Sequence, residues 1–246
     1  MTNTLILIPS RMAATRLPGK PLLKINNLSI ISHVCKRAEE ANIGEVVVAT
    51  EDHEILKDVT QNGGKGILTS SNHKTGTDRI FEAYKKLGIK NVDYILNLQG
   101  DEPNVNKDDI INLNNLMING DSEIGTLAAT IKDDKVLENK NVVKVITESK
   151  LNKNSFLTAS NFTRDNLSKV NKNIYHHIGI YSYKVSALEK FVNLKQTKNE
   201  IKSRLEQLRA LENNLKINVA LAKFSSIGVD TKEDYLAIKK IMEYKS

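Results

Sequence analysis

Residues 8–20 read IPSRMAATRLPGK and follow the apolar run Leu5–Ile8. We interpret this run as a buried strand that Pro9 ends, and residues 30–41 as the helix that packs back against it. The C-terminal edge of a parallel sheet is where α/β proteins bind ligands. The loop between strand and helix carries three cationic residues, which are Arg11, Arg16 and Lys20. Solvation could explain any one of them, but three on such a loop predict a phosphate-binding site.

The glycine and the lysine of this loop suit a triphosphate. Gly19 lets the backbone come close to a ligand, and Lys20 can place a point charge on a phosphate. The sequence contains neither the Gly-x-Gly-x-x-Gly spacing of dinucleotide-binding folds nor the Gly-x4-Gly-Lys-Ser/Thr spacing of P-loop proteins. The loop therefore represents neither of these two phosphate-binding motifs.

The composition favours a small anionic substrate over nucleic acid. The chain has 246 residues, 40% of them hydrophobic, which is enough for one large α/β core. Its net charge is +7, from 36 Lys and Arg against 29 Asp and Glu, and the lysines are spread along the whole chain. Aromatic residues make up only 5% and Trp is absent, so few side chains could stack on bases. We therefore expect no nucleic-acid partner.

Cysteine content and hydropathy indicate the compartment. Cys35 is the single cysteine, so an internal disulfide and a cysteine zinc cluster are excluded. Leu5–Pro9 is too short for the apolar region of a signal peptide, and no basic segment precedes it. No stretch approaches the ~18 apolar residues of a membrane span. We expect a cytoplasmic protein without a membrane partner.

Strands and helices alternate through the first half of the chain, as in a parallel sheet covered on both faces. Runs of β-branched residues predict the strands, and a 3.6-residue apolar period predicts the helices. The expected strands are 45–50, 67–69, 94–98 and 124–131, and the expected helices are 51–62, 77–87 and 107–117.

The region from about 133 to 199 breaks this alternation. It contains two expected strands, 142–147 and 177–183, and a polar stretch between them. We interpret the region as an insertion that extends from the sheet and returns to it, within a single domain of residues 1–246. The remaining expected elements are a long helix over 200–213, a strand over 217–223 and a last helix over 231–244.

Two aspartates have the surroundings of magnesium ligands. Asp101 follows the expected strand 94–98 in a Gly-containing turn, and its carboxylate is a hard oxygen donor. The alternative is that Asp101 only caps the following loop. Asp230 precedes Thr231–Asp234, which fits a capping box, so Asp230 could equally be the lead-in to the last helix.

Residues 69–79 are rich in small and polar side chains, which allow backbone groups to reach the edges of a base and a ribose. An arginine at the start of the following helix could donate to the base or to a phosphate. The alternative is a Ser/Thr-rich loop with an ordinary helix cap at Thr77. The candidate nucleotide-binding residues of this loop, and of the turn before Asp101, are Ser70, Thr75, Gly76, Arg79 and Gly100.

Further short segments stand out along the chain after residues 8–20. They are TGTDR at 75–79, QGDEP at 99–103, HIGIY at 177–181, LEQLR at 205–209 and VDT at 229–231. Each alone is a weak signal. Taken in order, they resemble the successive motifs of the 3-deoxy-manno-octulosonate (Kdo) cytidylyltransferase family, the CMP-Kdo synthetases.

This resemblance implies a fold, a reaction and partners. The fold is α/β: a Rossmann-like three-layer nucleotide-diphospho-sugar transferase fold with a central mostly parallel sheet and an inserted β-rich dimerisation region, here about 133–199. The family transfers CMP from CTP to Kdo with magnesium, as a step towards lipopolysaccharide. We therefore expect CTP and Kdo as substrates, Mg²⁺ as the cofactor and a homodimer.

The resemblance also assigns roles to residues. CMP transfer is attack on an α-phosphorus with pyrophosphate leaving, so cations and metal must meet at one triphosphate. The implied catalytic residues are Lys20, Asp101 and Arg11, and the implied metal ligands are Asp101 and Asp230. The positions that match contacts to the sugar acid are Gln99, Pro103, Arg164, His177, Glu206 and Gln207, with Pro103 shaping the turn.

Alternatives stay open for both residues and function. His177 could be a core histidine, and Glu206 and Gln207 could be solvated residues of a long amphipathic helix. A sister cytidylyltransferase acting on 8-amino-Kdo or a sialic-type acid would show the same phosphate loops. A nucleic-acid-binding module, suggested only by the basic charge, would instead show steeply salt-dependent binding and no turnover.

Overall fold

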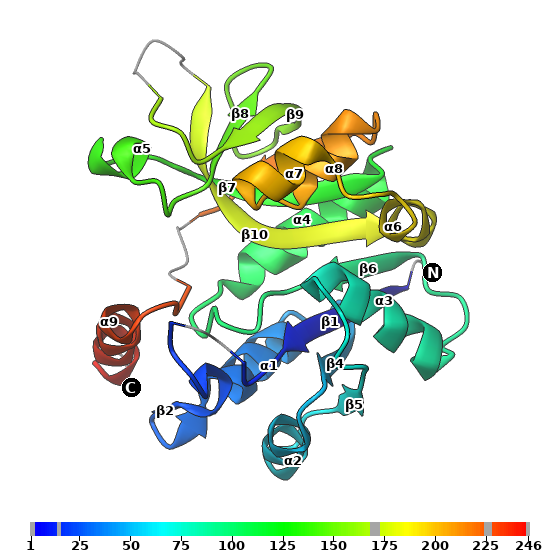
Figure 1. Ribbon diagram of the computed structural model, residues 1–246, viewed down its shortest axis with the longest axis vertical. Coiled ribbons are helices and arrows are strands. Elements are labelled where there is room, and N and C mark those ends of the chain that lie inside the picture. The colour runs from blue at the N-terminus through cyan, green and yellow to red at the C-terminus, as the bar shows by residue number, and fades with distance from the viewer. Residues whose placement is uncertain (1–2, 14–15, 168–172, 224–227, 245–246) are drawn as a thin grey trace. The chain divides into compact units, whose positions relative to one another are not determined.

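The computed structural model describes residues 3–13, 16–167, 173–223 and 228–244 (Figure 1). The chain divides into two compact units. The first comprises residues 1–111 and 226–246, and the second comprises residues 112–225. The expected insertion at about 133–199 falls wholly within the second unit.

Four parallel strands form the sheet of the first unit. Their order is β5 (Gly66–Leu68), β4 (Gly44–Thr50), β1 (Thr4–Ser10) and β6 (Tyr94–Asn97). Strand β1 is central, because Thr4 pairs with Gly44 on one side and with Tyr94 on the other. Its residues Leu5–Ile8 are buried, as expected for a parallel strand covered on both faces. The four strands expected from the sequence are confirmed, with small shifts at their ends.

The prediction that Pro9 ends the first strand is wrong. Pro9 lies inside β1, opposite Ala49 of β4. It lies beyond Leu7, which makes the last pair with β6. One edge of β1 is therefore no longer in a ladder at this point, and a residue without an N–H group can be accommodated there.

Three helices of the first unit pack against this sheet, namely α1 (Ile30–Glu40), α2 (His53–Gln61) and α3 (Gly76–Leu87). All three were expected. The cap of α3 differs from the expectation, because Thr75 and not Thr77 provides it. Thr75 Oγ1 accepts a hydrogen bond from the backbone N–H of Asp78 at 3.1 Å, and Thr77 is buried.

The C-terminal helix α9 (Lys232–Glu243) belongs to the first unit. Thr231 and Asp234 form the expected capping box, in which each side chain accepts from the other's backbone N–H. Ile238 packs with Ile25, which lies in an unexpected two-stranded ribbon. The short elements of this region are η1 (Lys20–Leu22), β2 (Lys24–Ile25) and β3 (Leu28–Ser29).

Five strands form the sheet of the second unit, and their pairings close a circuit. Strand β7 pairs with β10 (antiparallel) and β11 (parallel), β9 pairs with β11 and β8, and β8 pairs back with β10. The register of β10 against β7 shifts between Ile178 and Tyr181, which marks a bulge. The strands are β7 (Ile124–Thr130), β8 (Lys144–Thr147), β9 (Phe156–Thr163), β10 (Ile174–Lys184) and β11 (Ile217–Leu221).

Two features of the second unit differ from the sequence prediction. Strand β9 was not expected, because its apolar residues do not alternate cleanly. The long helix expected over 200–213 is in fact two short helices, α7 (Lys198–Ser203) and α8 (Gln207–Glu212). Arg204 between them adopts the left-handed conformation with φ 53°, which ends α7. The other helices are α4 (Lys107–Asn119), which contains the boundary between the units, α5 (Lys135–Glu138) and α6 (Val185–Val192).

Candidate active site

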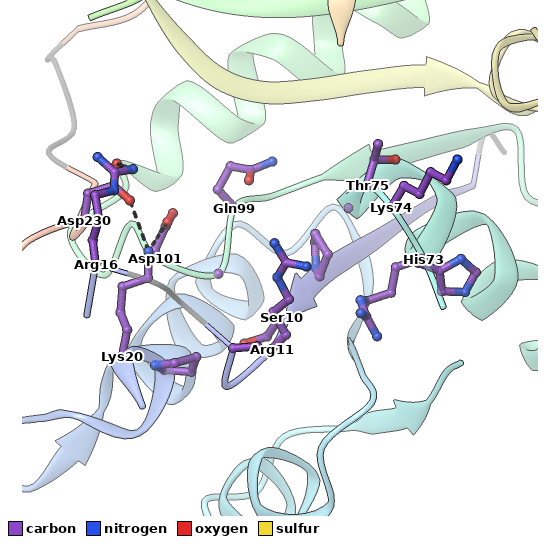
Figure 2. A pocket seen from close by; sticks show the side chains of 16 residues that line it. Ser10, Arg11, Arg16, Lys20, His73, Lys74, Thr75, Gln99, Asp101 and Asp230 are labelled. Carbon is purple, nitrogen blue, oxygen red and sulfur yellow. Dashed lines mark hydrogen bonds and ion pairs between the residues drawn. The ribbon is translucent and has the colours of Figure 1, made fainter. Parts of the chain in front are cut away.

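A pocket of about 360 Å³ lies in the first unit, where the ends of β1 and β6, the start of α3 and the segment before α9 meet (Figure 2). Segments that are far apart in the sequence thus share one site. The lining residues are Pro9, Ser10, Arg11, Ala13, Arg16, Lys20, Pro21, His73, Lys74, Thr75, Gly76, Arg79, Gln99, Gly100, Asp101 and Asp230.

Lys20 joins two aspartates in this pocket. Its Nζ atom lies 2.7 Å from Asp101 Oδ2 and 3.4 Å from Asp230 Oδ1. Arg16 Nη2 lies 3.0 Å from the other oxygen of Asp230, and Figure 2 shows these side chains converging from separate segments. The expected meeting of cations and carboxylates at one place is therefore observed.

The cations of the pocket differ in how firmly they are held. The side chain of Lys20 is 13% exposed, so its position between the carboxylates is well defined. The side chains of Arg16 and Asp230 are 58% and 48% exposed, and an ion pair in such a setting contributes at most about 1 kcal/mol. Arg11 is exposed as well. Arg16 and Arg11 can therefore turn towards an anionic ligand at little cost.

Backbone contacts hold the two carboxylates and the loop after β1 in place. The backbone N–H of Val229 donates to the carbonyl oxygen of Asp101 at 2.9 Å, which places Asp230 beside Asp101. The N–H of Met12 donates to Asp52 Oδ2 at 2.8 Å and anchors the start of the loop. Gly19 has φ 70°, a left-handed conformation that favours glycine, directly before Lys20.

The buried Arg79 side chain anchors the loop before α3 by hydrogen bonds. Arg79 is 3% exposed, and its guanidinium donates to Thr69 Oγ1 at 2.7 Å and to the carbonyl oxygen of Ser70 at 3.3 Å. It also forms an ion pair with Glu51. Arg79 lines the pocket but its donors are largely engaged by protein, and Ser70 is not among the lining residues. Both residues therefore shape the loop.

Two glycines of the pocket lie where a side chain has little room. A Cβ atom on Gly100 would come within 2.9 Å of the carbonyl oxygen of Pro9. A Cβ atom on Gly76 would lie 3.2 Å from the Pro9 ring. Gln99 lines the pocket beside Gly100, whereas Pro103 is buried and outside the lining. The turn after β6 therefore packs tightly on the end of β1.

In the second unit, Glu206 and Gln207 line a small cavity of about 50 Å³. Tyr181 and Tyr183 of β10 lie on the same cavity. Gln207 begins α8 and is buried, so the alternative of a solvated helix face does not hold for it. These two candidate sugar-binding residues, which are neighbours in the sequence, thus line one cavity.

His177 is buried in β10 of the second unit. Its Nε2 atom lies 3.1 Å from Thr126 Oγ1, and its ring packs against Phe162 and Tyr181. Burial lowers the pKa of His177 to about 3, and the charges of His176 and Arg164 act in the same direction. His177 is therefore neutral at physiological pH.

Arg164 follows β9, and its guanidinium is tied to the neighbouring loop. Its Nη1 donates to the carbonyl oxygen of Asn141 at 2.8 Å. The buried ammonium of Lys144 donates to the carbonyl oxygens of Arg164 and Asn139, at 3.0 Å each. Burial lowers the pKa of Lys144, and Arg164 lowers it further, while Asp165 opposes the shift. The buried ammonium of Lys144 thus fixes the backbone carbonyl group of Arg164.

Comparisons with known proteins identify the family. The cytidylyltransferase family profile matches residues 5–217. The 3-deoxy-manno-octulosonate cytidylyltransferase of Nitrobacter hamburgensis is 43% identical over 242 residues, which cover 98% of this chain and 93% of that protein. That of Thermodesulfovibrio yellowstonii is 43% identical over 253 residues, covering 97% and 98%.

This chain belongs to the 3-deoxy-manno-octulosonate cytidylyltransferase family. A solved structure of CMP:2-keto-3-deoxy-manno-octonic acid synthetase complexed with CTP matches with a TM-score of 0.89 at 30% identity, covering 100% of both chains. UTP-bound UGPase from Acinetobacter baumannii shares the fold, with a TM-score of 0.71 at 12% identity. The chain therefore has the mixed α/β nucleotidyltransferase fold of the CMP-Kdo synthetases. None of its described helices is long and apolar enough to cross a membrane.

The carboxylates of Asp101 and Asp230 are chemically suited to a magnesium ion. Asp101 and Asp230 already share one cation, because both approach the ammonium of Lys20. Among the described residues there is no cluster of three or more His, Cys, Asp or Glu side chains suited to a metal. Mg²⁺ characteristically binds to one or two carboxylates and to substrate phosphates, so the donor set present is adequate.

Three polar pocket residues of this cytidylyltransferase were not singled out as site residues from the sequence. Ser10 Oγ is buried without a hydrogen-bond partner among the described residues, which leaves it available to a ligand. His73 and Lys74 line the pocket from the loop before α3. The positive charge of Lys74 in a predicted nucleotide loop was the available signal. Ser10 gave none, because its place in the pocket depends on where β1 ends.

Proposed function

We propose that this protein transfers CMP from CTP to the anomeric hydroxyl of Kdo, giving CMP-Kdo and pyrophosphate. The observation that carries the proposal is the ion cluster in which Lys20 lies between Asp101 and Asp230 in the pocket. A triphosphate needs positive charges and a metal held by carboxylates at one place, and this cluster contains a lysine ammonium and two carboxylates. The names of the curated relatives favour Kdo over a sister keto sugar acid.

Different residues of the pocket bind and orient different groups of CTP. Lys20 supplies a fixed positive charge, and Arg11 and Arg16 supply guanidinium groups that can pair with phosphate oxygens in a fork. Ser10 and the backbone at Gly76 and Gly100 offer short polar contacts. Neutralising the triphosphate makes pyrophosphate a better leaving group, because negative charge grows on it during the displacement.

Asp101 and Asp230 are the proposed magnesium ligands. When bound there, Mg²⁺ would balance charge on the triphosphate oxygens. We expect Asp101→Asn to fold normally and to lower kcat by about a hundredfold or more, since an amide keeps the size but not the charge. Asp121→Asn is the matched control, because Asp121 pairs with Lys184 on the surface. Near-normal kcat of the Asp101 variant at saturating Mg²⁺ would refute the assignment.

The proposed contacts of the sugar acid are the residues that match the contact positions of the family, namely Gln99, Pro103, Arg164, His177, Glu206 and Gln207. A cation suits the carboxylate of Kdo, and carboxylate or amide groups suit its hydroxyls.

We also propose that residues 1–246 act as one domain with a Rossmann-like layered core. The protein would be a cytoplasmic homodimer that is formed through about 133–199. Its reaction would be a step towards lipopolysaccharide.

The reaction is tested by measuring pyrophosphate release. The purified protein is incubated with CTP, Mg²⁺ and a panel of acids comprising Kdo, 8-amino-Kdo and a sialic acid. We expect release that depends on both CTP and Kdo, with the highest kcat/KM for Kdo. A clear preference for another acid would replace the proposed substrate but keep the reaction class. No release with any acid would overturn the proposed function.

A further inference from the structure

Thr126 lies at the centre of a buried hydrogen-bond cluster in the second unit. It belongs to β7 and faces the bulge of β10, where the strand register shifts. Its Oγ1 atom lies 2.7 Å from the carbonyl oxygen of Ile180 and 3.2 Å from that of Ile178. The same atom lies 3.1 Å from Nε2 of His177. Thr126 has no exposed surface, so water does not compete for these contacts.

The hydrogens of this cluster can be assigned by counting donors. A threonine hydroxyl carries one hydrogen, and a carbonyl oxygen only accepts. The close contact to Ile180 therefore takes the hydroxyl hydrogen. If the hydroxyl pointed at Nε2 instead, two oxygen atoms without a hydrogen would face each other at 2.7 Å in a buried site. It follows that Nε2 of His177 carries a hydrogen and donates it to Thr126.

The other ring nitrogen of His177 is then an acceptor. Because the buried ring is neutral, a hydrogen on Nε2 leaves a lone pair on Nδ1. Among the residues that the structure describes, no hydrogen bond to Nδ1 is found. Phe162 packs on the ring edge-on at 5.1 Å and Tyr181 at 5.4 Å between centroids, which limits rotation of the ring.

We propose that Thr126 is a positioning residue that holds His177 as the Nε2–H tautomer, so that Nδ1 accepts a hydrogen bond from a hydroxyl of the sugar acid. This inference rests on the proposed function, in which His177 contacts that substrate. A neutral acceptor attracts a hydroxyl hydrogen and disfavours a carboxylate oxygen. His177 therefore selects the hydroxyl-bearing part of the substrate, and the carboxylate must be recognised by a cationic residue.

The tautomer is tested on the free protein with imidazole ¹⁵N–¹H correlation spectra at neutral pH. We expect Nε2 of His177 to be protonated in the wild type and in Thr126→Ser, which keeps the hydroxyl. Thr126→Val keeps the shape and removes the hydroxyl, so we expect a changed spectrum with a population of the Nδ1–H tautomer. A wild-type spectrum that shows Nδ1–H would overturn the proposal without any variant.

Steady-state kinetics separate positioning from general stability. For Thr126→Val we expect KM for Kdo to rise by about tenfold, the effect of one lost hydrogen bond, while KM for CTP is unchanged. Thr126→Ser should restore the wild-type KM for Kdo. Equal loss for both substrates, or wild-type values in the valine variant, would overturn the proposal. If wild-type protein does not turn over Kdo at all, the proposed function fails, and the spectrum of the free protein still decides the tautomer.

Discussion

At the scale of single residues, Lys20 determines the charge balance of the pocket. Without a ligand its ammonium compensates the carboxylates of Asp101 and Asp230. Removal of this cation would leave two neighbouring negative charges at the place where a triphosphate has to bind. Lys20 thus favours CTP binding in two ways, because it attracts phosphate and it screens the negative charges of the carboxylates.

We expect Lys20→Ala to raise KM for CTP and to lower kcat, with kcat/KM down by about a hundredfold or more, as for other groups that stabilise developing charge. Initial rates at varied CTP measure both constants. Lys24→Ala is the control, because Lys24 is exposed and does not line the pocket. If the Lys20 variant lost only thermal stability and kept both constants, Lys20 would have a structural role alone.

At the scale of secondary structure, the break between α7 and α8 puts the candidate sugar-binding residues Glu206 and Gln207 at the start of a helix. Arg204 adopts φ 53°, which costs a non-glycine residue about 1 kcal/mol or more. A buried ion pair across the break offsets this cost. Arg209 Nε donates to Glu200 Oε2 at 2.9 Å, and the guanidinium lies over the ring of Phe191. The break lets a new helix begin at Gln207.

We expect Arg204→Gly to stabilise the folded protein by up to about 1 kcal/mol, because glycine adopts this conformation without strain. Lys202→Gly, two residues earlier within α7, should instead destabilise by up to about 1 kcal/mol. Urea unfolding of the two variants and the wild type gives the sign of each effect. A destabilised Arg204 variant would show that its side-chain contacts outweigh the backbone strain.

At the scale of the whole molecule, each unit contains a carboxylate whose pKa is lowered by folding. Burial alone would raise the pKa of Glu82 in α3, but hydrogen bonds from Lys86, from His73 and from the N–H of Ser70 lower it to about 2. The pKa of Glu200 is also lowered, because contacts from Arg209 and Gln196 and the N–H of Thr197 outweigh its burial. Both ionised carboxylates therefore stabilise the folded protein.

The pH dependence of the folded protein's stability follows from these pKa shifts. A carboxyl group with a lowered folded pKa stabilises fully above its unfolded pKa, and the contribution is lost as the pH falls towards the folded value. For Glu82 this window runs from about 4.5 down to about 2. We expect Glu82→Gln and Glu200→Gln to lower Tm strongly at pH ~7 and less at pH ~3. Glu148→Gln, an exposed control, should follow the wild type at both pH values. A Tm difference that does not shrink in acid would contradict the assignment.

Local signals in the sequence were enough for the four sheet strands and the main helices of the first unit. These strands, helices α1 to α3 and the Thr231 capping box depend on neighbouring residues, which is why periodicity and caps predicted them. The ribbon of β2 and β3 was not predicted. In the second unit, strand β9 lacks clean alternation, and the break at Arg204 has no glycine or proline to mark it. These two features depend on contacts with distant strands and helices, which local patterns do not contain.

The sequence by itself determined the class of the protein, the cationic loop after the first strand and the set of polar residues available to a nucleotide. Only the tertiary structure decided which of them meet. Asp101 and Asp230 lie 81 and 210 positions from Lys20 along the chain and yet share its ammonium. It also decided that Arg79 is engaged by Glu51 and that His177 faces Thr126. Such contacts arise when the sheet and helices bury their apolar faces, since packing brings distant strand ends to one place.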